Sequence, residues 1–63
     1  TSPIYQFIAR RIGILPTDVN VVNGVLTITI PAAEASRRNI ADIRYELDRV
    51  YSARYDKIQL VLQ

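Results

Sequence analysis

The side chains that could do acid–base chemistry in this 63-residue chain are six carboxylates, because the chain contains neither histidine nor cysteine. They are Asp18, Glu34, Asp42, Glu46, Asp48 and Asp56. Asp42 and Glu46 are spaced to share one helix face, where two carboxylates could act as a general acid and base. Arginines also stand four residues before Asp42 and Asp48, which is the spacing of helical ion pairs (Arg38–Asp42 and Arg44–Asp48). We therefore interpret these carboxylates as partners in surface ion pairs.

Other kinds of catalytic or ligand-binding site lack their usual residues. Without histidine and cysteine, the commonest general base, thiol nucleophiles and most transition-metal ligands are missing. The two glycines, Gly13 and Gly24, are too far apart in the sequence to form a phosphate-binding loop. We expect a protein that is not an enzyme and has no cofactor, no bound metal and no small-molecule substrate.

Two pairs of adjacent arginines are candidates for binding. Arg10 and Arg11 fall in one expected helix, and Arg37 and Arg38 fall in another. If both helices cover one face of a sheet, the pairs form a basic patch for phosphates or for an acidic partner. The alternative is that the arginines are separately solvated, with the stem of Arg11 packed along the edge of the core.

Three tyrosines, two in the second expected helix and one directly after it, are also candidates. Tyr45 lies almost opposite the apolar stripe of that helix, as an interface anchor would, although a tyrosine stacked on a neighbouring arginine has the same position. The helix is expected to be longer than the strands. Tyr51 and Tyr55, near its end, then either fold back on the core or contact a neighbouring protein.

The last candidates are three valines on the outer face of the expected sheet. Val22, Val25 and Val61 lie there among uncharged polar residues. A β-branched face with few charges favours packing or pairing with another chain.

The elements that position these residues follow from apolar spacing and turn residues. Ser2 as N-cap and Pro3 at the first position predict a helix over Pro3–Ile12, which Gly13 ends. Asn23-Gly24 between alternating strands predicts a hairpin with a type I′ turn, in which Val22 pairs with Val25. Val19, Val21, Leu26, Ile28 and Ile30 then share the core face. A long helix is expected from Ala33 to Arg54, and a last strand with Ile58, Leu60 and Leu62 on its apolar side.

The order α-β-β-α-β predicts an α+β fold: a two-layer sandwich with a three-stranded sheet and two helices on one face. The sequence leaves open where the third strand joins the sheet. Residues 1–63 form a single domain, and we expect it to be excised from a longer polypeptide, because the chain starts at Thr1 and stops within the last strand.

The run Asp18–Ile28, with the helix over Arg37–Ala41 and the strand Ile58–Leu62, resembles BON domains and the ring-building motifs of bacterial secretion and sporulation machines. This resemblance implies side-by-side packing of copies in a ring, or docking near a membrane through the parent protein, without catalysis. It also implies a location in the bacterial periplasm or envelope. On topology alone, the chain is also similar to a ferredoxin-like βαββαβ fold whose first strand precedes Thr1.

We therefore expect a structural or interaction module that assembles with copies of itself or with a larger protein complex. The alternative is a KH-like nucleic-acid-binding module that uses the helical arginines. A net charge of only +2 and the lack of a GXXG loop favour the first of these functions.

Overall fold

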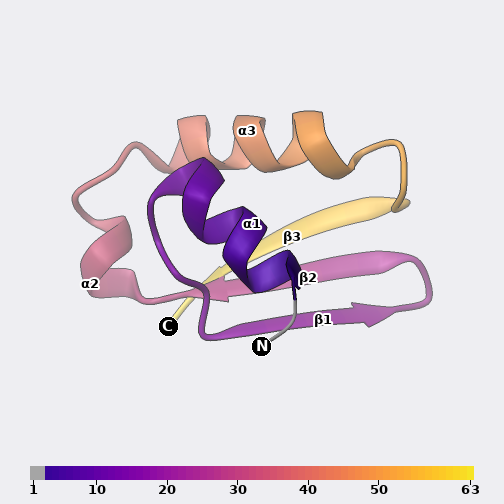
Figure 1. Cartoon of the computed structure of the whole chain (residues 1–63), viewed down its shortest axis with the longest axis horizontal. Coiled ribbons are helices and arrows are strands. Elements are labelled where there is room, and N and C mark those ends of the chain that lie inside the picture. Colours follow the sequence, from indigo (N-terminus) through magenta and orange to yellow (C-terminus); the bar gives the residue numbers. More distant parts are fainter. Residues whose placement is uncertain (1–2) are drawn as a thin grey trace.

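The computed structural model describes residues 3–63 and shows three strands in one sheet, covered on one face by helices (Figure 1). In chain order the elements are α1 (Pro3–Ile12), β1 (Asp18–Val22), β2 (Val25–Ile30), α2 (Ala32–Ala35), α3 (Ile40–Tyr51) and β3 (Lys57–Leu62). The predicted α+β sandwich is confirmed. Among the described residues, no helix is long and apolar enough to cross a bilayer.

Helix α1 has the bounds that the sequence predicts, Pro3–Ile12. Its N-cap prediction concerns Ser2, which lies outside the described residues. The helix ends at Gly13, whose φ of 75° is the left-handed conformation that glycine adopts without steric cost. The Gly13 N–H donates to the Ala9 carbonyl at 2.8 Å, which satisfies one of the last free carbonyls of the helix.

The hairpin of β1 and β2 has the predicted register, with Val22 opposite Val25 and Val19 opposite Ile28. Asn23 and Gly24 both have positive φ, as a type I′ turn requires. The core-face residues of β2, Leu26, Ile28 and Ile30, are fully buried. Val21 shares their face but is exposed, because it stands on the outer strand beside the turn and outside the buried cluster.

The prediction of one helix from Ala33 to Arg54 is wrong. The structure has a short helix α2 and a separate helix α3, joined by residues 36–39. Asn39 is extended, and its side-chain Oδ1 accepts a hydrogen bond from the Ala41 N–H at 2.9 Å, so it is the N-cap of α3. Asn39, followed by Asp42 in the first turn, was the sequence signal for a helix beginning at Ile40.

Strand β3 pairs with β2 in parallel, with Leu26 opposite Ile58 and Ile30 opposite Leu62. The sheet order is therefore β1-β2-β3, and β2 is central. Because β2 and β3 are direct neighbours, they form an unsplit β-α-β unit. This differs from the split unit of a ferredoxin-like fold.

The core lies between β2 and the two longer helices. It combines Ile8 and Ile12 of α1 and Ile43 and Leu47 of α3 with the apolar residues of β2. The twelve residues of α3 span about 18 Å, close to the roughly 20 Å of the six-residue strand β3. The predicted overhang of the helix beyond the sheet is therefore absent.

Candidate interaction surfaces

The free edge of β1 is occupied by a side chain of α1. The Val19 N–H points away from β2 and donates to the hydroxyl of Tyr5 at 3.0 Å. A side chain that binds an outward-facing amide removes one of the groups that a further strand would use. Tyr5 was not among the predicted site residues, because nothing local in the sequence links it to a strand fourteen residues away.

The free edge of β3 has no such cover. The Gln63 N–H donates to the Ile30 carbonyl at 3.1 Å, so the odd-numbered residues of β3 face β2. The backbone groups of Ile58, Leu60 and Leu62 therefore face outward. Within residues 3–63, no side chain forms a hydrogen bond with them. Leu62, at 46% exposure, also leaves its side chain partly free.

A groove of about 330 Å³ runs between α3 and the open edge of β3. It is lined by Ala41, Arg44, Tyr45, Leu47, Asp48, Ile58 and Leu60. Tyr45, which the sequence analysis selected, forms one wall and is 67% exposed. The alternative of a tyrosine stacked on a neighbouring arginine is not seen, because the one arginine–aromatic contact among residues 3–63 joins Arg11 to Phe7.

A second hollow, of about 380 Å³, continues along β3. Arg44 borders this hollow as well as the groove, and Lys57 lies at the start of the strand. The predicted ion pair between Arg44 and Asp48 is absent. Within the described part of the chain, no carboxylate lies within 4.0 Å of Arg44 or Lys57. Two uncompensated cations therefore stand beside the open edge.

The other two predicted tyrosines are packed inside the domain. Tyr51 is only 4% exposed and meets Phe7 edge-on, with 6.0 Å between ring centroids. Tyr55 is half-buried and lies 6.0 Å from Tyr51. Burial raises the pKa of the Tyr51 phenol above its ordinary value, Tyr55 adds to the rise, and Arg54 opposes it. Of the alternatives that the sequence left open for Tyr51, the structure shows packing on the core.

Of the four predicted arginines, Arg38 and Arg11 contact other residues of the domain, whereas Arg10 and Arg37 form no ion pair within residues 3–63. Arg38 donates to the Ile12 carbonyl and so caps the C-terminus of α1. Arg11 lies over the Phe7 ring and pairs with Glu46 at 3.7 Å. Arg10 and Arg37 are exposed, with no carboxylate within 4.0 Å in residues 3–63.

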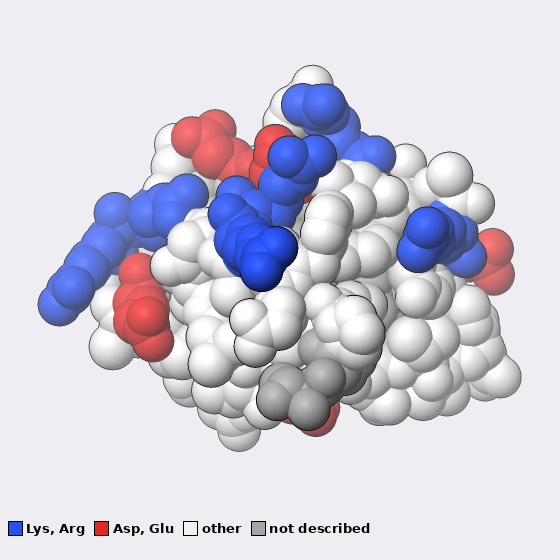
Figure 2. All heavy atoms as spheres, viewed as in Figure 1, with Lys and Arg blue, Asp and Glu red and all other residues white. Residues whose placement is uncertain are grey.

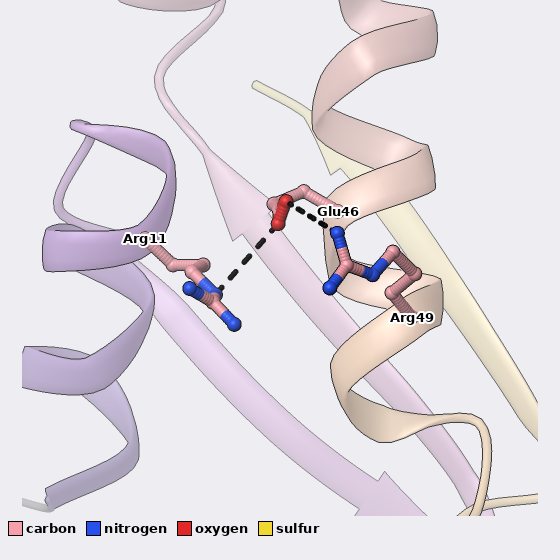
Figure 3. A network of polar contacts seen from close by, with 3 residues as sticks. All are labelled: Arg11, Glu46 and Arg49. Atoms are coloured by element: carbon pink, nitrogen blue, oxygen red, sulfur yellow. Dashed lines mark ion pairs between the residues drawn. The ribbon is translucent and has the colours of Figure 1, made fainter.

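The helical face carries both signs of charge. Figure 2 shows basic side chains over the part of this face that the helices form, with acidic side chains between them. Glu46 lies between two arginines and also pairs with Arg49 at 3.9 Å (Figure 3). The predicted pair Arg38–Asp42 is absent, since Arg38 binds the carbonyl of Ile12 instead. The arginine pairs therefore do not form a purely basic patch.

The outer face of the sheet is not one apolar surface. Val22 and Val25 are paired beside the turn, whereas Val61 lies opposite Thr29 near the far end. Between them, the Thr27 hydroxyl donates to the Gln59 side-chain carbonyl at 3.3 Å. Val22 and Val61 are exposed and Val25 is half-buried, so the three predicted valines make two separate small patches.

Comparison of the chain with protein-family models, with curated proteins and with solved structures found no match. The resemblance to BON domains and ring-building motifs stays a prediction from the sequence.

Proposed function

We propose that this domain is a non-catalytic interaction module that assembles with copies of itself or with a larger protein complex. The observation that supports this most is the position of Tyr45. It is a large aromatic side chain, two-thirds exposed, on the wall of a groove beside an unpaired strand edge. Tyrosine is enriched among residues that dominate binding energy, because it buries much area and loses little side-chain entropy.

The test is the molar mass of the chain in solution, measured by light scattering over a concentration series at low and high salt. If the partner is a second copy, the mass should rise above 7.2 kDa with concentration and persist in salt, because apolar contacts are not screened. Tyr45→Ala should weaken association by about tenfold or more, as a central interface tyrosine does. Tyr45→Phe, which keeps most of the buried area, is the matched control. A monomer under every condition would contradict self-assembly.

A second function, nucleic-acid binding, has one observation in its favour. Arg10 and Arg37 are exposed, and no carboxylate among residues 3–63 lies within 4.0 Å of them. Binding to phosphates through these residues should weaken steeply with salt, and Arg10→Ala or Arg37→Ala should reduce both affinity and salt dependence. A titration with single-stranded and duplex oligonucleotides at two salt concentrations separates this function from protein assembly.

A further inference from the structure

The open edge of β3 has the geometry of a strand that lacks its neighbour. Ile58, Leu60 and Leu62 direct their backbone N–H and C=O groups outward, and the side chains of Ile58 and Leu60 line the groove beside α3. An extended chain laid along this edge would form ladder hydrogen bonds with these three residues. Its alternate side chains would then meet the groove wall that Tyr45 forms.

The charges beside the edge indicate what such a chain carries. Arg44 borders both hollows along β3, and Lys57 begins the strand. Neither has a carboxylate within 4.0 Å in residues 3–63, and Asp48 is the one acidic residue that lines either hollow. Carboxylate side chains on the added strand would compensate these cations.

We propose that an extended segment of a partner protein, with carboxylate side chains between apolar ones, adds to β3 as a fourth strand of the sheet. This inference rests on the proposed interaction function and specifies its partner and its site. Backbone hydrogen bonds would supply the affinity. The apolar groove and the two cations would supply the selectivity.

The charges favour such a segment over a second copy of this chain. Two β3 strands paired antiparallel about Leu60 would satisfy the outward groups of both copies. Arg44 lies beside Leu60, however, so this two-fold pairing would bring both Arg44 side chains toward the axis, where like charges repel. A carboxylate-bearing strand meets the same cations with opposite charge.

The experiment titrates the chain with a short peptide that alternates Val with Glu, followed by amide NMR. We expect the amides of Ile58, Leu60 and Leu62 to shift and to exchange more slowly with solvent, while that of Val19 on β1 does not change. A peptide with Lys in place of Glu, and one N-methylated along its strand-facing edge, should each bind at least about tenfold more weakly.

Two variants test separately the contribution of charge and that of the backbone hydrogen bonds to peptide binding. Arg44→Gln should weaken binding of the Glu peptide by about two- to fivefold, the range of an exposed ion pair, and the effect should shrink in high salt. Leu62→Pro removes an outward N–H while leaving the bonds between β3 and β2 in place, and should weaken binding by about tenfold. Leu62→Ala is its control, because it loses the side chain but keeps the N–H. Circular dichroism checks that each variant is folded.

Each contrary result overturns a different part of the inference. Equal binding of the N-methylated peptide overturns strand addition, and equal binding of the Lys peptide overturns carboxylate recognition. If no peptide binds but the chain dimerises and Leu62→Pro abolishes the dimer, a second copy occupies the edge. The proposed function then stands and the acidic segment is overturned. A chain that is monomeric and binds no peptide contradicts both.

Discussion

β1 and β3 flank the same central strand, but within residues 3–63 a side chain forms a hydrogen bond with the outer edge of β1 and none does so with that of β3. On β1, the hydroxyl of Tyr5 accepts the outward N–H of Val19. On β3, the outward backbone groups of three alternate residues, Ile58, Leu60 and Leu62, form no hydrogen bond within residues 3–63. The groove beside this edge holds an exposed tyrosine and an arginine without a carboxylate partner among the same residues. An open edge is a hazard that proteins usually block, so an edge left open beside such a groove favours a role in binding.

The sequences of the two strands do not explain this difference. Each strand carries one charged residue, at its first position: Asp18 in β1 and Lys57 in β3. Neither contains proline, the other common block to edge pairing. The difference comes from α1, which brings Tyr5 to β1. Edge protection in this domain is therefore a tertiary contact and is not encoded within the strands.

The largest effect should come from Gly24→Ala, because it disturbs both edges together. Gly24 has a φ of 79°, and an added Cβ would lie 2.5 Å from the Asp56 Oδ2. The Gly24 carbonyl also accepts the Asp56 N–H at 2.8 Å, which joins the hairpin turn to the start of β3. We expect a loss of at least about 1–2 kcal/mol in the free energy of unfolding, measured by urea denaturation.

Gly13→Ala is the matched control for this substitution. Gly13 also has positive φ, but the atom nearest an added Cβ, at 2.8 Å, is Nη1 of Arg38, the far end of a long side chain that can move aside at the cost of its hydrogen bond to the Ile12 carbonyl. We expect a smaller loss than for Gly24→Ala and no selective change in hydrogen exchange at the strand edges. Equal losses at the two glycines would contradict a specific link between the turn and β3.

Tyr5→Phe tests the protection of β1 directly. Removing the hydroxyl should cost about 0.5–1.5 kcal/mol and speed hydrogen exchange at the Val19 amide, because that N–H loses its acceptor. The variant should make the two edges more alike, so we also expect more self-association through β1. Tyr45→Phe, at a tyrosine hydroxyl without a hydrogen bond in residues 3–63, should leave Val19 unchanged. An unchanged exchange rate in Tyr5→Phe would show that the contact does not protect the edge.

The smallest expected effect concerns Tyr51, in the layer of helices that covers one face of the sheet. Burial raises the pKa of Tyr51 above the ordinary value of 10.0, so at high pH the unfolded chain loses this proton more readily than the folded one. Its contribution to stability is present below pH 10 and is lost as pH rises through the folded pKa. We expect Tyr51→Phe to flatten the fall in unfolding free energy above that pH, compared with the unsubstituted chain. The same slope in Tyr51→Phe and in the unsubstituted chain would contradict this origin.

Much of the local structure could be predicted from the sequence. Pro3 and Gly13 mark the bounds of α1, and Asn23-Gly24 with the alternating valines predicts the hairpin and its register. The break between α2 and α3 was missed because the apolar stripe continues across it, although Asn39 is a typical N-cap. For the candidate site, the sequence predicted Tyr45 at an exposed position. It did not identify Arg44, Lys57 or Leu62, because their role depends on which strand becomes the edge.

The sequence by itself determined the element types, the turn and the β1–β2 register, since these depend on residues close together in the chain. The tertiary structure decided that β3 joins β2 in parallel, that Tyr51 packs on Phe7, that Arg38 caps α1 and that Tyr5 covers β1. Each of these contacts joins residues far apart in the sequence. Local propensity does not fix such contacts, because they form only when the amphipathic elements bury their apolar faces together.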